Sequence, residues 1–201
     1  MPKYIQREVE LLISENRKFY SINALKEMGY THYRINQLVA AGELCKINKK
    51  FYENLHYDGE ESDFYYASAY APEGVICLLS AAVYYGLTTY RPEAVDVAIP
   101  RKGKVSTLPA WPELNICYFT DNRFETGIQT VNEGENTFRI YDMEKTVVDV
   151  VYYREKVELE ETKEILVTYL RREDRNLNRL IRYARILKCA DVMEKYLEVL
   201  V

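Results

Sequence analysis

Cysteine, histidine and tryptophan are scarce in this 201-residue chain, which has four Cys, two His and one Trp. The cysteines form no CxxC pair, and neither His32 nor His56 lies near a cysteine at the spacing of zinc ligands. We therefore predict no metal site and no cofactor. A basic, apolar leader and an apolar run of about 18 residues are also missing, so we expect a cytoplasmic protein that is neither secreted nor inserted in a membrane.

The composition is that of a folded protein, with 48% hydrophobic and 29% charged residues, and the length leaves room for two domains. The net charge of −4 is unevenly divided. Residues 1–56 hold nine basic and six acidic residues, a balance of +3, and residues 57–201 hold 18 basic and 25 acidic ones, a balance of −7. Because local charge governs the attraction of phosphate, the first part is the candidate for nucleic-acid contact.

Residues 20–52 contain two helix starts, each followed by a glycine stop. Ser21 can cap a helix that buries Leu25 and ends at Gly29, and Thr31 can cap a second helix that ends at Gly42. Two short helices joined by a tight glycine-containing turn are typical of a helix-turn-helix motif. An amphipathic helix over residues 4–15 completes a predicted three-helix core.

The second helix would bury Ile35, Leu38 and Val39 and turn its polar side outward. In a helix-turn-helix protein the N-terminal residues of this helix meet base edges in the major groove. Asn and Gln can pair with adenine, and Arg with guanine or phosphate. The alternative for Tyr33 alone is that it covers neighbouring apolar surface. The residues that we expect to contact DNA are Thr31, His32, Tyr33, Arg34, Asn36 and Gln37.

The segment after Gly42 is predicted to form two short strands around Asn48 and Lys49. Its lysines, Lys46, Lys49 and Lys50, lie at or beside the tip, where they can reach phosphates. The alternative is a solvated hairpin whose lysines protect an exposed edge. With the helices, this hairpin makes residues 1–56 a predicted winged helix-turn-helix.

Residues 57–201 are predicted to form a second domain, a mixed α/β unit with a helical C-terminal tail, which makes the fold class α+β. Residues 54–62 lose apolar periodicity and are interpreted as a linker. Asp142 is predicted to cap a helix. The expected helices cover residues 62–71, 75–85 and 143–154 and most of the chain from 159 onward, and the expected strands cover residues 94–99, 114–119, 127–131 and 137–141, the last two paired as a hairpin.

Candidate catalytic groups in this second part have better structural explanations, so we predict that the protein is not an enzyme. A phosphate-binding loop around Gly103 fails, because Ala98 stands where glycine is needed and Val105 where Ser or Thr is needed. Its basic residues Arg101, Lys102 and Lys104 fit a solvated loop better than a contact with DNA or a partner. Three other candidates are also disfavoured, because helix capping and core packing explain their residues better. They are an acid/base or metal cluster of Asp142, Glu144 and Asp149, a nucleophile at Ser80, and base stacking by Tyr65, Tyr66, Tyr70, Tyr84 and Tyr85.

Five arginines gather in the C-terminal region: Arg172, Arg175, Arg179, Arg182 and Arg185. Residues 175, 179 and 182 can share one helical face, which would give a second patch that contacts phosphate or a neighbouring protomer. The equal alternative is a solvated face paired with Asp174 and nearby glutamates.

The chain resembles the AbiEi family of antitoxins from type IV toxin-antitoxin systems over nearly its whole length. The resemblance rests on the hairpin GELCKINKKFY, on LLSAAVYYGLT followed by VDVAIP, and on IYDMEKTVVDVV before a helical tail. The family's hairpin usually has an arginine-glycine pair before its hydrophobic-tyrosine end, where this chain has Lys49 and Lys50.

The resemblance implies a bacterial autorepressor, active in abortive infection as a phage defence, that binds repeats in its own promoter. It also implies a C-terminal domain that counters a nucleotidyltransferase-like toxin, typically without a stable complex, and it gives the C-terminal arginines a role in operator binding. Two alternatives stay open: a ligand-sensing winged-helix transcription factor and, with less support, a nucleic-acid-processing enzyme.

Overall fold

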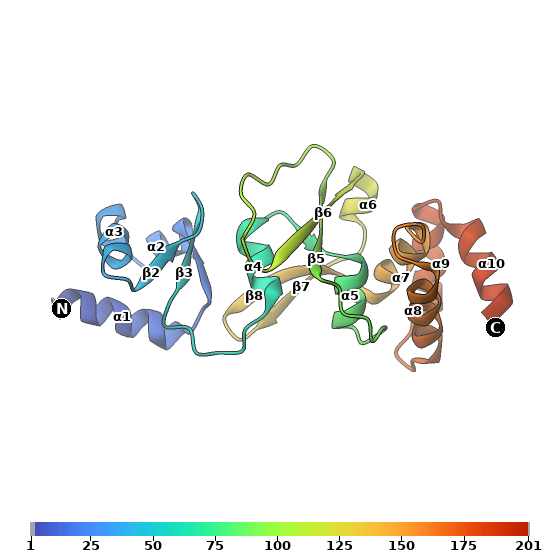
Figure 1. Ribbon diagram of the computed structural model, residues 1–201, viewed down its shortest axis with the longest axis horizontal. Helices are drawn as coiled ribbons and strands as arrows, with labels where there is room; N and C mark the ends of the chain where they lie inside the picture. Colours follow the sequence, from blue (N-terminus) through green and yellow to red (C-terminus); the bar gives the residue numbers. More distant parts are fainter. Residues whose placement is uncertain (1–2, 201) are drawn as a thin grey trace.

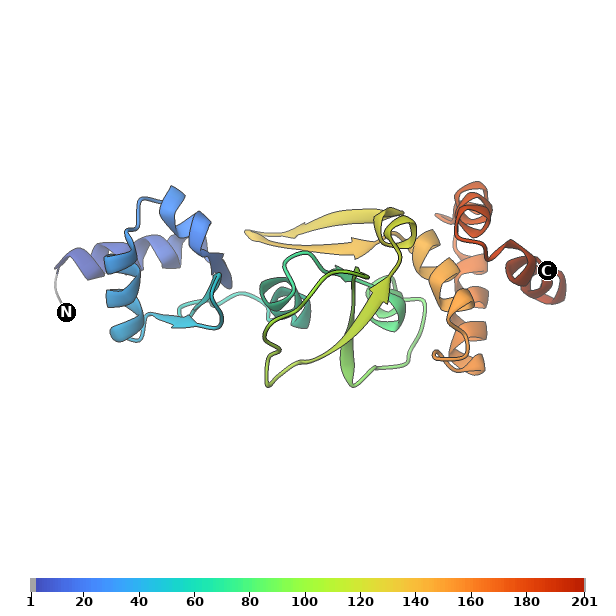
Figure 2. The same cartoon turned by 90° about the horizontal axis from the view of Figure 1, so that it is seen from above.

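The computed structural model describes residues 3–200 of the chain, and the side chains of residues 9–198. It is a mixed α+β structure in which an N-terminal unit, a central sheet and a helical end follow one another along the longest axis (Figures 1 and 2). None of the helices in the described range has both the length and the apolar character that crossing a membrane requires.

The N-terminal unit has three helices and a small antiparallel sheet with strand order β1-β3-β2. In the sheet, Tyr52 of β3 lies opposite Tyr20 of β1 on one side and Lys46 of β2 on the other. The elements are α1 (Lys3–Glu15), β1 (Phe19–Ser21), α2 (Ile22–Glu27), α3 (His32–Ala40), β2 (Leu44–Lys46) and β3 (Phe51–Asn54).

Local signals in the sequence explain these elements. The Ser21 and Thr31 side chains accept hydrogen bonds from the third residue after each, as predicted for N-caps. The two predicted glycine stops adopt φ angles of 91° and 75°, which side chains with a Cβ rarely tolerate. The core of the unit consists of Val9, Leu12, Tyr20, Leu25, Tyr30, Ile35, Leu38, Leu44 and Tyr52.

The central part is a five-stranded mixed sheet with strand order β6-β5-β4-β8-β7. The predicted hairpin of the last two strands is confirmed by their antiparallel pairing. The short helix α6 was not predicted. The elements are α4 (Asp63–Tyr70), β4 (Val75–Ile76), α5 (Leu78–Tyr84), β5 (Ala94–Pro100), β6 (Glu113–Phe119), α6 (Asp121–Glu125), β7 (Ile128–Glu133) and β8 (Asn136–Tyr141).

The prediction that one helix covers residues 75–85 is wrong at its start. Val75 and Ile76 form the middle strand of the sheet, antiparallel to β5 and parallel to β8 through Ile140. The helix begins only at Leu78, whose φ of 44° marks the sharp turn between strand and helix. The partners of this strand are distant in sequence, and two residues are too few to show a periodicity of their own.

The helical end consists of α7 (Met143–Tyr152), α8 (Leu159–Arg171), α9 (Leu177–Ile186) and α10 (Ala190–Leu200), as the sequence predicted in outline. In Figure 1, α7 lies between the sheet and the other three helices. Its residues from Met143 to Val151 are all buried, including the polar side chains of Glu144, Lys145, Thr146 and Asp149.

An ion cluster ties α7 to its neighbours. The Asp149 carboxylate, with no exposed surface, pairs with both the Lys145 ammonium and the Arg123 guanidinium. Burial lowers the pKa of Lys145, and the Asp149 carboxylate opposes that shift. Arg123 also donates to the Leu187 carbonyl at 2.8 Å, which joins α6 to the end of α9.

Replacing Asp149 by Ala should destabilise the protein by about 3–5 kcal/mol, because it leaves two buried cations without their counter-charge. Urea unfolding followed by circular dichroism measures this. Asp191→Ala, at an exposed site on α10, is the control and should change stability by at most about 1 kcal/mol. A destabilisation by Asp149→Ala no larger than the control's would contradict the role given to the cluster.

Candidate nucleic-acid interface

Helix α3 presents a polar face to solvent because its apolar face is fixed in the core. Ile35 and Leu38 have no exposed surface and pack in the same cluster as Leu25. The opposite side carries Tyr33, whose side chain is 71% exposed, together with exposed Asn36. His32 and Arg34 are exposed as well, and Gln37 is half-buried. The residues predicted to contact DNA on this helix are therefore all at least partly accessible, with Tyr33 opposite the buried face.

Two contacts order this surface. The Thr31 hydroxyl accepts from the Arg34 backbone amide at 3.3 Å, so it fixes the start of the helix. Thr31 is exposed at this start, and its contact with DNA stays a prediction. One turn apart, the Gln37 carboxamide donates to the Tyr33 hydroxyl at 3.1 Å, which places a phenol and an amide side by side on the outer face.

The β2–β3 hairpin carries the three predicted lysines on exposed positions. The Asn48 side-chain oxygen accepts from the amides of Lys50 and Phe51, at 2.8 and 2.9 Å, and thereby closes the turn. This turn holds Lys49 and Lys50 at the tip. Lys46 lies on β2, and its ammonium is 6.0 Å from the centre of the Tyr52 ring.

One side of the same hairpin is attached to the central part of the protein. The Asn48 amide nitrogen donates to the Ala69 carbonyl of α4 at 3.0 Å. Ile47 and Phe51 pack against the buried cluster that contains Ala69 and Ile76. The hairpin is therefore covered on this side, whereas its lysines remain in solvent, which fits both a contact with phosphates and the alternative of lysines that protect an exposed edge.

Lys18 supplies a second attachment that the sequence did not reveal. Its backbone amide donates to the Asn136 side chain of β8 at 2.8 Å, and its ammonium pairs with Glu53 at 3.0 Å and Glu61 at 2.6 Å. Burial alone lowers the pKa of Lys18, but the hydrogen bonds to Glu61 and Glu53 outweigh it, so the pKa lies above its ordinary value. The first contact joins residues 118 positions apart, and no local pattern announces it.

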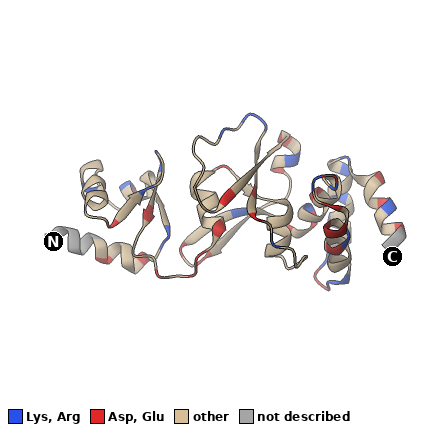
Figure 3. Ribbon diagram, viewed as in Figure 1, with Lys and Arg blue, Asp and Glu red and all other residues tan. Residues whose placement is uncertain are grey.

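The five C-terminal arginines do not form the predicted helical face. Helix α9 begins only at Leu177, so Arg175 precedes it and cannot share a face with Arg179 and Arg182. Arg172 pairs with Asp174 at 2.7 Å and Arg179 with Glu144 at 3.4 Å, which agrees with the alternative of pairing within the chain. Arg175, Arg182 and Arg185 are exposed. All five lie in the helical half, at the opposite end of the molecule from α3 (Figures 1 and 3).

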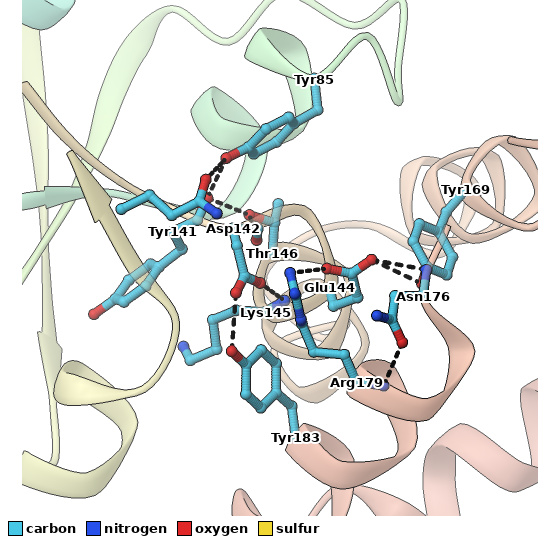
Figure 4. Close-up of polar contacts among 11 residues, drawn as sticks. Tyr85, Tyr141, Asp142, Glu144, Lys145, Thr146, Tyr169, Asn176, Arg179 and Tyr183 are labelled. Carbon is cyan, nitrogen blue, oxygen red and sulfur yellow. Dashed lines mark hydrogen bonds and ion pairs between the residues drawn. The ribbon is translucent and has the colours of Figure 1, made fainter. Parts of the chain in front are cut away.

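The acidic residues around α7 are engaged in the fold. Asp142 accepts from the Lys145 amide at 2.8 Å and from the Tyr183 hydroxyl at 2.9 Å, and burial raises its pKa. Glu144 accepts from the Tyr169 hydroxyl at 3.2 Å and the Asn176 amide at 3.0 Å (Figure 4). These contacts join the end of the sheet to α8 and α9, as a structural role requires.

Two further candidates also have structural explanations. The Ser80 hydroxyl is buried and accepts from the Asp96 amide at 2.8 Å. Tyr65, Tyr66, Tyr70 and Tyr85 pack in or against the central cluster, as the core interpretation predicted. Tyr84 is exposed, although its ring contacts those of Phe64 and Phe138. Within residues 3–200, no three His, Cys, Asp or Glu side chains are grouped so as to hold a metal ion.

Comparison with known proteins gives no family for this chain: no family model matches it, and no curated protein matches it. The functional conclusion therefore depends on the geometry of α3 and the hairpin. The resemblance to AbiEi antitoxins, which rests on short sequence motifs, stays a prediction.

Proposed function

We propose that residues 1–56 form a winged helix-turn-helix domain that binds double-stranded DNA, with α3 as the recognition helix and the β2–β3 hairpin as the wing. One observation carries the proposal: α3 is capped at its start, buried on one side and polar on the accessible side. The order of elements, with a first strand before α2 and a hairpin after α3, supports the assignment of a winged helix. A helix of nine residues, about 13 Å long, suits the major groove.

The side chains of α3 and of the wing have different roles in binding. Asn36 and Gln37 have the donor and acceptor pair that recognises adenine, and Arg34 suits guanine or phosphate. Tyr33 adds contact area and a hydroxyl on the same face. The wing lysines hold the phosphate backbone, which sets the register without reading sequence.

We further propose that the target is a set of repeats in the protein's own promoter, and that residues 57–201 counter a nucleotidyltransferase-like toxin without a stable complex. The AbiEi resemblance supports this part. Its motifs fall on α5 and β5 and on β8 and α7, which surround the middle of the sheet. The motifs of the resemblance are therefore close together in the fold.

A ligand-sensing winged-helix regulator is the second candidate. It is favoured by a cavity of about 340 Å³ in the central part, a volume within the range of small-molecule sites. Asp96 and Asn115 are among its lining residues, and burial raises the pKa of Asp96. A compound that raises the melting temperature and also shifts DNA affinity would favour this candidate over an antitoxin.

Replacing Tyr33, Arg34 and Gln37 by Ala should weaken binding to promoter DNA at least about tenfold, because removing a side chain that reads a base costs about 1–3 kcal/mol. Binding to unrelated duplex should change less. Fluorescence anisotropy at fixed salt measures both. The control is Tyr90→Ala with Arg91→Ala, an exposed pair on another surface. Unchanged promoter affinity in the α3 variant, with its melting temperature intact, would overturn the recognition-helix assignment.

Reversing the wing charges with Lys49→Glu and Lys50→Glu should weaken promoter and unrelated DNA by a similar factor, because phosphate contacts carry no sequence information. The slope of log affinity against log salt should fall by about 2 in magnitude. Lys163→Glu with Lys195→Glu, on exposed positions of α8 and α10, is the charge-matched control. A control effect equal to that of the wing variant would show that net charge, and not the wing, is responsible.

The antitoxin role predicts that the full chain restores growth to cells expressing the nucleotidyltransferase-like toxin encoded beside its gene. The Tyr33, Arg34 and Gln37 variant should restore growth equally well when both proteins are made from independent promoters, because its defect lies in DNA binding alone. Gel filtration of the mixed proteins should show separate peaks. Failure of the intact chain to restore growth would refute the role.

A further inference from the structure

We propose that the basic loop after β5 belongs to the same DNA-binding surface as the wing and contacts phosphates that flank the site read by α3. This inference rests on the proposed function and extends it to the second half of the chain. The surface, named here the basic strip, consists of Lys49, Lys50, Arg101, Lys102 and Lys104.

The wing and the loop meet at a shared depression. A cavity of about 140 Å³ is lined by Lys50 of the wing and Lys104 of the loop, together with Tyr70 and Pro72. This volume is well below that of a small-molecule site. The depression is therefore better understood as a seam across which two basic segments form one surface.

Both segments are held on the same support. The wing is attached to α4 by the hydrogen bond from Asn48 to Ala69 and by the packing of Phe51. The loop begins with a turn in which the Gly103 amide donates to the Pro100 carbonyl at 2.7 Å, and Val105 packs against the same central cluster. The fold thus fixes the positions of the wing and the loop relative to each other, so neither segment has to become ordered when DNA binds.

The charge of the strip is not neutralised by the described part of the protein. All five of its side chains are exposed, and among the described residues none of the five forms an ion pair with a carboxylate. Glu73 is the one acidic residue that lines the seam. Five exposed cations on two adjacent segments give this surface a local positive charge, which would attract an external polyanion.

The position of the strip favours duplex DNA beside the recognition site. In Figure 3, basic residues mark the wing tip and the loop above the sheet along the same upper edge of the molecule, and α3 lies further along that edge in Figure 1. A duplex held by α3 and the wing would continue over the loop. The loop would add phosphate contacts on the wing side only, and these would not depend on sequence.

The test uses the full chain and a variant with Arg101→Gln, Lys102→Gln and Lys104→Gln. Removing two or three phosphate contacts should lower the magnitude of the salt slope by about 2–3 and weaken binding at about 0.1 M salt by at least about tenfold. Promoter and unrelated duplex should be affected alike. On a promoter duplex shortened on the wing side to the recognition site, wild type and variant should bind equally.

Arg171→Gln, Lys163→Gln and Lys195→Gln form the matched control, with the same residue types and charge change on the helices at the far end. The control should keep the wild-type slope. The inference is overturned if the loop variant has the same salt slope as the control. It is also overturned if the loop variant still binds more weakly than wild type on the shortened duplex. If wild type binds no duplex at all, the proposed function fails with it; if wild type binds and only the α3 variant loses affinity, the inference alone fails.

Discussion

The attachment of the β2–β3 hairpin to α4 is the constraint on which the rest of the structure depends. A hydrogen bond such as that from Asn48 to Ala69 contributes about 1 kcal/mol by itself. The packing of Ile47 and Phe51 and the buried contacts of Lys18 add to it, so several different interactions hold the same joint. The N-terminal unit therefore has one orientation, in which the outer face of α3 is open to solvent.

The two ends of the molecule use their charges differently. At the helical end, ion pairs stabilise the fold: Asp149 pairs with both Arg123 and Lys145, and Glu144 contacts Tyr169 of α8, Asn176 before α9 and Arg179. Around the hairpin and the loop after β5, lysines and arginines stay in solvent. Arg175, Arg182 and Arg185 at the helical end are exposed as well, so a chain of net charge −4 carries exposed cations in both regions.

Features encoded within one or two helical turns could be predicted from the sequence. Ser21, Thr31 and Asp142 cap helices as expected, and the composition of residues 137–141 predicted a strand correctly. The strand at Val75 and Ile76 could not be predicted, because its partners lie more than 20 residues away. The hydrogen bond from Asn48 to the Ala69 carbonyl of α4 could not be predicted for the same reason. For the candidate interface, local patterns identified the residues of α3 and the wing, but the seam with Lys104 exists only in three dimensions.

The central proposal is that α3, the β2–β3 hairpin and the loop after β5 bind one DNA duplex. Amide hydrogen exchange of the full chain, with and without its promoter duplex, tests it most directly. We predict added protection in α3, in the hairpin tip over residues 46–50 and in the loop over residues 101–104. We expect little change in α8 to α10. Protection confined to the helical end, with α3 and the hairpin exchanging as in the free protein, would contradict this claim.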